Sequence, residues 1–328
     1  MASQNGHAAA AKLLLSGGAA ADATDANGNT ALGQLANFSK DDAATMAGVL
    51  LKGGANVDRV GGAFGFTALH LASVRGNAGL TTVLLAAGAK VDAVATNFNG
   101  LTPLLFAAQQ GHASVVVALL DGGAAHAAAS LDGSTALHHA SRWGRTATVA
   151  ELLRRGAVHD TVDHEGMSCL HVASQNGLAA AAKLLLSGGA AADAIDSYGA
   201  TALHLASSKG NAETTEALLR GGATVDMADP GGWNSLHLAS LGGKADSVRV
   251  LLAGGAQVGA VLVASNGATA LHMASRGGAH TVASLLLDGG ASIGARDRQG
   301  NTPAMLAKQQ GHESTRELLQ LYEEALSI

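Results

Sequence analysis

Residues 199–226 decide the fold, and their sequence is GATALHLASSKGNAETTEALLRGGATVD. Thr201 stands just ahead of an apolar run, at a place where a hydroxyl group caps the start of a helix. Gly210 is expected to end this first helix, because glycine tolerates the left-handed conformation common at helix ends. A second helix is predicted from about 212 to 219, and a Gly-Gly pair follows it. The stretch therefore predicts two short helices joined by a turn.

The same pattern recurs nine times along the chain. Its anchor is the Thr, Ser or Asn ahead of each first helix, and successive anchors lie 37, 35, 33, 33, 33, 33, 35 and 33 residues apart. A Leu-Leu pair follows most anchors after 17 residues. Helices this short are marginal in water, so stability has to come from stacking of neighbouring repeats. The anchors are Thr30, Thr67, Thr102, Thr135, Ser168, Thr201, Asn234, Thr269 and Thr302.

The repeat resembles that of the ankyrin-repeat family, over nearly the whole chain. The family pattern Gly-x-Thr-Pro-Leu-His-x-Ala is similar to GATALHLA at 199–206, and the family's later Gly, Leu-Leu and Gly-Ala follow it here. The family's proline is kept at Pro103 and Pro303, whereas Gly33 and Leu105 replace the histidine. The resemblance implies an all-α solenoid of helix-turn-helix repeats with short β-hairpin fingers.

We expect nine ankyrin repeats over 26–328 and a partial repeat over 1–25. Ala2–Asp25 matches Ala173–Asp196 at 22 of 24 positions, so the partial repeat is predicted to hold a second helix without a first. This start in mid-repeat suggests a fragment of a longer array. At the other end, the apolar stretch 318–322 followed by two glutamates predicts a C-terminal cap.

Extra residues interrupt the regular spacing at four places. About three are inserted around 37–42, in the first full repeat. Longer connections also precede Thr67, Thr102 and Thr269, where the family places its fingers. Insertions in repeat arrays lie in loops, often on the binding face.

Composition and charge favour a soluble, cytoplasmic protein, which we expect to be a monomer. The net charge is −5 and no basic stripe is present, which argues against a nucleic-acid partner. Cys169 is the only cysteine, so the chain has no internal disulfide, and its first residues lack the pattern of a signal peptide. The uncharged stretches 93–120 and 250–275 are interrupted by Gly, Asn, Gln and His, so membrane insertion is not expected.

The residues able to do chemistry form no catalytic or cofactor motif. Six of the 14 histidines share one repeat position, so neighbours lie about 8–10 Å apart, too far to share a zinc ion. The resemblance implies that this histidine ties adjacent turns together by hydrogen bonds. Cys169 is expected to be a buried thiol, so we expect neither an enzyme nor a cofactor. The six are His70, His138, His171, His204, His237 and His272.

Aromatic residues gather where the family binds its partners. The resemblance implies a concave face built from finger tips and the exposed side of each first helix, and seven of the nine aromatic residues fall at those positions. Aromatic side chains are common anchors of interfaces; the alternative is that they pack on one another to stiffen the fingers. The predicted partner-binding residues are Phe64, Phe66, Arg75, Phe98, Arg142, Trp143, Met167, Tyr198, Lys209 and Trp233.

Together these features predict a scaffold or adaptor that binds another protein along an extended groove. The alternative function is a regulatory ankyrin segment of a larger enzyme or channel, acting on its neighbour in cis. The start in mid-repeat keeps that alternative open.

Overall fold

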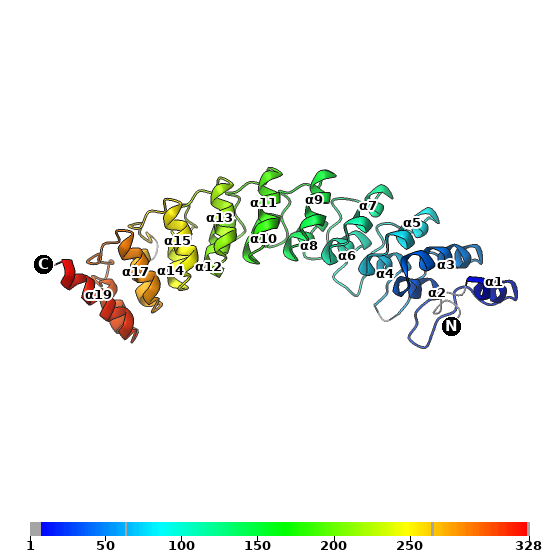
Figure 1. Cartoon of the computed structure of the whole chain (residues 1–328), viewed down its shortest axis with the longest axis horizontal. Coiled ribbons are helices and arrows are strands. Elements are labelled where there is room, and N and C mark those ends of the chain that lie inside the picture. The colour runs from blue at the N-terminus through cyan, green and yellow to red at the C-terminus, as the bar shows by residue number, and fades with distance from the viewer. Residues whose placement is uncertain (1–7, 63, 264–265, 327–328) are drawn as a thin grey trace. The chain divides into compact units, whose positions relative to one another are not determined.

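The computed structural model describes residues 8–62, 64–263 and 266–326, and it is all-α, as predicted. Its contacts divide the chain into two compact units, residues 1–164 (unit 1) and 165–328 (unit 2). Within each unit the first helices of successive repeats pack side by side in one row, and the second helices form a second row (Figure 1). None of the helices in the described part is both long and apolar enough to cross a lipid bilayer.

Unit 1 holds the helix of the partial repeat and the first four full repeats. Even-numbered helices are first helices of a repeat and odd-numbered ones are second helices. Residues 1–7 of the partial repeat lie outside the described residues. The helices of unit 1 are α1 Ala8–Ser16, α2 Ala31–Gln34, α3 Lys40–Lys52, α4 Ala68–Arg75, α5 Ala78–Ala86, α6 Pro103–Gln110, α7 Ala113–Asp121, α8 Ala136–Arg142 and α9 Thr146–Arg154.

Unit 2 holds the remaining five repeats in the same arrangement. Its last helix is longer than the other second helices and carries the residues predicted to form a C-terminal cap. The helices of unit 2 are α10 Cys169–Gln175, α11 Ala179–Ser187, α12 Ala202–Lys209, α13 Ala212–Arg220, α14 Ser235–Leu241, α15 Ala245–Ala253, α16 Ala270–Arg276, α17 His280–Asp288, α18 Pro303–Gln309 and α19 Glu313–Leu326.

The predicted anchors are the N-cap residues of all nine first helices. At α12 the Thr201 hydroxyl accepts a hydrogen bond from the backbone N–H of His204, which satisfies one of the free donors at the helix start. Gly210 ends the same helix with φ of 83°, in the left-handed region, as the sequence predicted. The bounds of each first helix thus follow from local capping.

The core of each unit lies between its two rows and consists mainly of leucine and alanine. In the second to the eighth repeat, the first leucine of the Leu-Leu pair is fully buried, whereas the second is partly exposed. Burying a leucine side chain contributes roughly 1.5–3 kcal/mol. The fully buried members of the pairs are Leu84, Leu119, Leu152, Leu185, Leu218, Leu251 and Leu286.

The fingers are shorter than the predicted β-hairpins. In the described residues they are turns closed by isolated bridges, such as Ile195 with Thr201 in unit 2 and Ala95 with Leu101 in unit 1. Asp196 shows why the fingers are short. Its carboxylate accepts hydrogen bonds from the backbone N–H groups of Tyr198 and Ala200. These donors are therefore held by a side chain and do not extend a ladder between strands.

The first full repeat differs from the others where the sequence has its insertion. Its first helix, α2, has four residues and continues as one 3-10 turn, Leu35–Asn37. Its second helix, α3, begins after the N-cap residue Ser39 and has 13 residues, against nine in α5. The extra residues therefore lengthen the start of the second helix.

An aspartate ladder links the repeats within each unit. The third residue after the Gly-Ala pair is an Asp. Its carboxylate accepts a hydrogen bond from the backbone N–H of the residue that directly follows Gly-Ala in the next repeat, as Asp58 does from Lys90 at 2.9 Å and Asp226 from Gln257 at 3.0 Å. The ladder is interrupted where another residue occupies the aspartate position, at Ala127 in unit 1 and at Gly259 in unit 2, one repeat before Ser292.

Replacing Gly259 by Asp is expected to raise the free energy of unfolding of unit 2 by about 1 kcal/mol. The new carboxylate would accept the N–H of Ser292, and an intramolecular hydrogen bond contributes about 0.5–1.5 kcal/mol. A Cβ at Gly259 meets no atom within 4 Å, and its φ is not positive. The matched control is Gly294→Asp, which occupies the same position in the last repeat. Urea unfolding followed by circular dichroism should show a clearly larger increase in the free energy of unfolding for Gly259→Asp than for Gly294→Asp. Equal increases would contradict the idea that the new carboxylate binds the N–H of the next repeat.

Candidate functional site

The repeat histidines serve the fold, as the resemblance implied. In His204 the backbone N–H of Thr201 donates to Nδ1 at 3.0 Å, so the ring proton is on Nε2, which donates to the carbonyl of Trp233 at 3.0 Å. His70, His171, His237 and His272 use both ring nitrogens in the same way. Burial lowers the pKa of His70, His204, His237 and His272, opposed by the bond to the carbonyl. These rings are therefore neutral, and their hydrogen bonds connect one repeat to the next.

A Ser–Asp–His group that the sequence did not single out lies in unit 1. His139 Nε2 is 3.2 Å from the Ser130 hydroxyl, and that hydroxyl donates to Asp132 at 2.5 Å. Burial lowers the pKa of His139 to about 4, although Asp132 opposes this. Because the serine proton is directed to the carboxylate, His139 is not placed to remove it. The group holds the fourth finger against its helix.

The single cysteine, Cys169, lies in the interior of unit 2. The thiol is fully buried at the start of α10, as predicted. In the part of the chain that the structure describes, no three His, Cys, Asp or Glu side chains gather at metal-binding distance.

An aromatic cluster in unit 1 brings three predicted site residues together. Phe64, Phe66 and Phe98 have ring centroids 5.6–5.8 Å apart. Phe106 of α6 lies beneath them, with its ring centroid 5.2 Å from that of Phe66, and is buried. Phe64 and Phe98 remain 55% and 41% exposed, whereas Phe66 is half-buried. The cluster thus combines the two interpretations: its lower rings stiffen the fingers and its upper rings face solvent.

The other predicted residues of unit 1 lie at the ends of first helices. Arg75 is exposed in the last turn of α4, and Trp143 at the end of α8 is 54% exposed. Arg142 lies next to Trp143 and pairs with the buried carboxylate of Asp163 at 3.6 Å. This ion pair ties the end of α8 to the residues of the following finger.

Of the four predicted residues in unit 2, two are exposed, one is buried and one is partly buried. Tyr198 at the finger tip is 76% exposed, and Lys209 is exposed in the last turn of α12. Met167 is only 8% exposed, which differs from the exposed position that we expected. It directly precedes the cap residue Ser168, a place where apolar side chains pack onto the following helix. Its side chain therefore belongs to the interior.

Trp233, the last predicted residue, forms one wall of a cavity of about 410 Å³ in unit 2. Its ring packs against a buried apolar group of Leu262, Ala268 and Met273. The polar rim contains Arg276 and Asp297, together with amide side chains from α18. Sequence reasoning missed this cavity, although the longer connection before Thr269 marked the finger that forms it.

Comparison with known proteins agrees with this architecture. A family model described as ankyrin repeats (3 copies) matches residues 1–95, 84–163, 149–229, 170–261 and 236–326. The structure is similar to the crystal structure of the human ASB11 ankyrin repeat domain, with a TM-score of 0.59 and 28% sequence identity, over 67% of this chain and 97% of that chain. Among curated proteins, no sequence matches significantly. Because the family matches extend over the length of the chain, this protein belongs to the ankyrin-repeat family.

Proposed function

We propose that this chain is a scaffold or adaptor that binds another protein through exposed aromatic side chains at its finger tips and first-helix ends. The observation that supports this is positional: of nine aromatic residues, the four exposed ones all lie there. Covering a water-exposed ring with a partner lowers the free energy and so favours binding, and the ring loses little side-chain entropy when it is fixed. The four are Phe64, Phe98, Trp143 and Tyr198.

Positive charges accompany these rings. Arg75, Arg142 and Lys209 all lie in the last turn of a first helix, where the helix dipole favours a cation. Arg75 and Lys209 are exposed. A partner segment that alternates apolar and acidic side chains would complement both the rings and the charges.

The test is affinity capture from source-cell lysate with the native chain and with a variant carrying Phe64→Ser, Phe98→Ser, Trp143→Ser and Tyr198→Ser. Partners retained by the native chain are expected to fall at least tenfold with the variant. Mass spectrometry identifies and quantifies them, and circular dichroism checks that both chains are folded. Phe66 and Trp233 are left unchanged, because their half-buried rings also support the fold.

The matched control replaces two exposed apolar residues away from the fingers and first helices. Val158→Ser and Leu321→Ser remove side chains that are 63% and 64% exposed, so they lower surface hydrophobicity without changing the proposed site. The control is expected to retain the partners. Equal retention by all three chains, or an equal loss from both variants, would contradict the proposal.

A further inference from the structure

The cavity beside Trp233 in unit 2 (the Trp233 cavity) has a counterpart in unit 1 that is filled. Trp233 corresponds to Phe66, since each directly precedes a cap residue. Met273 corresponds to Phe106, since each lies on the first helix of the next repeat, four residues after the cap. In unit 1 the ring of Phe98 packs on both, with its centroid 5.6 Å from that of Phe66 and 5.7 Å from that of Phe106. A phenylalanine ring therefore fills in unit 1 the space that is open in unit 2.

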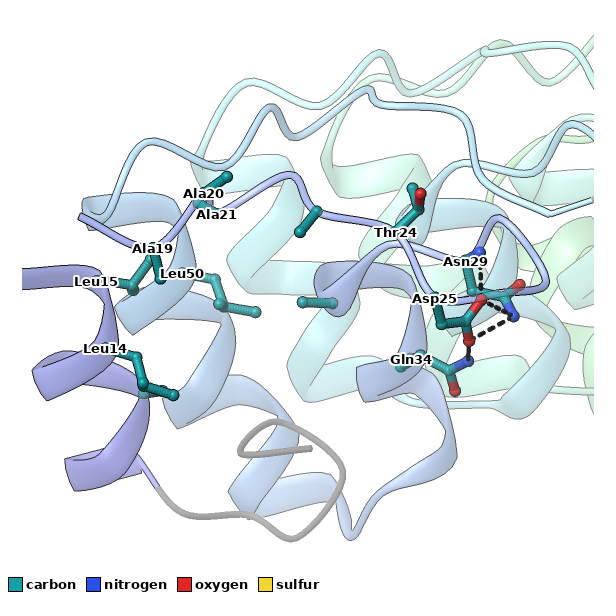
Figure 2. A pocket seen from close by; sticks show the side chains of 13 residues that line it. Leu14, Leu15, Ala19, Ala20, Ala21, Thr24, Asp25, Asn29, Gln34 and Leu50 are labelled. Carbon is teal, nitrogen blue, oxygen red and sulfur yellow. Dashed lines mark hydrogen bonds between the residues drawn. The ribbon is translucent and has the colours of Figure 1, made fainter. Parts of the chain in front are cut away.

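The finger of the eighth repeat has a leucine where most fingers have an aspartate, five residues before the cap. Figure 2 shows the usual aspartate in the first finger, where the carboxylate of Asp25 accepts hydrogen bonds from the side chains of Asn29 and Gln34. Leu262 takes this place in the eighth repeat, because its backbone N–H donates to the carbonyl just before the cap residue, as that of Asp25 does. The Leu262 side chain is 1% exposed and belongs to the apolar group against which Trp233 packs. Leucine in place of aspartate thus gives the cavity an apolar wall.

The finger of the eighth repeat brings no ring of its own to this cavity. In unit 1, Phe98 lies three residues after Ala95, which makes the closing backbone bond of its finger. The same position after Leu262 is Ser265. This serine and the alanine before it carry only a hydroxymethyl and a methyl group, and neither can replace a ring. The described lining runs from the finger of the seventh repeat to α18 of the ninth, so the cavity lies within the array and is not the place of an absent repeat.

The rim of the cavity carries a positive charge that no carboxylate neutralises. Arg276 at the end of α16 is exposed, and no acidic side chain among the described residues forms an ion pair with it. The acid of the described lining, Asp297, is already satisfied, since its oxygens accept from the Asn266 side chain and the Asn301 backbone N–H, both at 2.8 Å. In unit 1 the position of Arg276 is Gln109. An occupant that carries a carboxylate therefore gains an ion pair that the filled counterpart does not offer.

We propose that the Trp233 cavity binds an aromatic side chain of another protein, carried on a segment that has an acidic residue next to it. The ring packs on Trp233 and Met273 as Phe98 packs on its partners in unit 1, and the carboxylate pairs with Arg276. An aromatic side chain in a pocket is a common anchor of protein interfaces. This inference rests on the proposed function, because a protein partner supplies the ring. It adds a pocket in unit 2 to the exposed rings and specifies what the partner must present to it.

The probe is a peptide with the sequence GSFEGS and both ends capped, so that its glutamate is its only charge. It is titrated into the full chain, whose methionine methyl groups are isotope-labelled for NMR. The signal of Met273 is expected to shift, whereas that of Met46, which is buried in unit 1, is expected to stay unchanged. Replacing the peptide's phenylalanine by alanine is expected to weaken binding about tenfold or more. Replacing its glutamate by glutamine is expected to weaken binding about threefold, as for an exposed ion pair.

Two variants of the chain test the ion pair. Arg276→Gln copies Gln109 of unit 1 and is expected to weaken binding of the native peptide about threefold. It is expected to leave binding of the glutamine peptide unchanged, because that peptide has no carboxylate to lose. Arg249→Gln is the matched control, since it removes the same charge from an exposed residue of α15, in the row of second helices. This control is expected to bind both peptides as the native chain does.

The proposal is overturned if the peptide leaves the Met273 signal unchanged, if the alanine peptide binds as well, or if Arg276→Gln and Arg249→Gln have equal effects. Phenylacetate carries a ring and a carboxylate without a peptide chain. Binding of phenylacetate as tight as that of the peptide would assign the cavity to a small aromatic acid instead. The variant without the four exposed rings keeps Trp233 and Arg276, so it should still show the Met273 shift. Peptide binding and capture from lysate can therefore fail separately, and each failure contradicts only its own proposal.

Discussion

Lowering the pH from 7.5 to 5.5 is expected to lower the free energy of unfolding of unit 2, by at most about 4 kcal/mol. The groups responsible are His204, His237 and His272, each at most 1% exposed. Their Nδ1 atoms accept a hydrogen bond from the backbone N–H of the cap residue. Protonation of Nδ1 would place its N–H against that backbone N–H, and two donors cannot form a hydrogen bond. The fold therefore tolerates only the neutral rings.

The sign of the effect follows from the direction of the pKa shifts. Burial lowers the folded pKa of all three histidines below the unfolded value of about 6.5. Below pH 6.5 the unfolded state thus binds more protons than the folded state, and stability falls as the pH falls towards the folded pKa. Each histidine contributes at most about 1.4 kcal/mol per pH unit, so three contribute at most about 4. Above pH 6.5 their full stabilising contribution is present.

Urea unfolding at a series of pH values, with hydrogen exchange to separate the two units, measures this effect. The chain offers its own control, since Leu105 occupies the histidine position in α6. His204→Leu is expected to reduce the pH dependence of the free energy of unfolding of unit 2 by about one third, because it removes one of the three titrating histidines. If unit 2 unfolds at the same urea concentration at both pH values, the histidines do not carry the acid sensitivity.

Local capping made the repeat boundaries predictable, whereas the direction of individual side chains depended on the neighbouring repeat. Residues directly before the cap were expected on the exposed face, yet Met167 is buried and Trp233 is half-buried. At Trp233 the cause is a bond from outside its own repeat: His204 of the preceding repeat donates to the Trp233 carbonyl. This bond holds the backbone against α12 and turns the residue inwards.

Residues three or four positions before the cap were predicted more successfully. Phe64, Phe98 and Tyr198 lie at the finger tips, beyond the reach of that histidine bond, and all are exposed. The Trp233 cavity was not predicted, because it needs Leu262 and Met273, from a finger and a helix, to meet. These residues do not share one position of the repeat, so the spacing of the anchors cannot predict that they come into contact.

Leu185→Ala and Leu14→Ala are expected to lower the free energy of unfolding by very different amounts, although they change the same position of two helices with the same nine-residue sequence. Leu185 is fully buried in α11, and truncating a buried leucine to alanine costs about 2–5 kcal/mol. Leu14 is 55% exposed in α1, so its truncation is expected to cost less than about 1 kcal/mol. Helix propensity cancels in the comparison, since both helices are AAAAKLLLS.

Hydrogen exchange and urea unfolding of the two single variants measure this difference directly. Leu185→Ala should reduce the protection of α11 and of the helices packed on it, α10 and α13. Leu14→Ala should affect α1 and leave unit 2 unchanged. Equal losses would mean that each helix carries its stability in its own sequence. Unequal losses would show that the neighbouring helix α10 supplies it, and that the same sequence in α1 gains as much only when a helix covers Leu14.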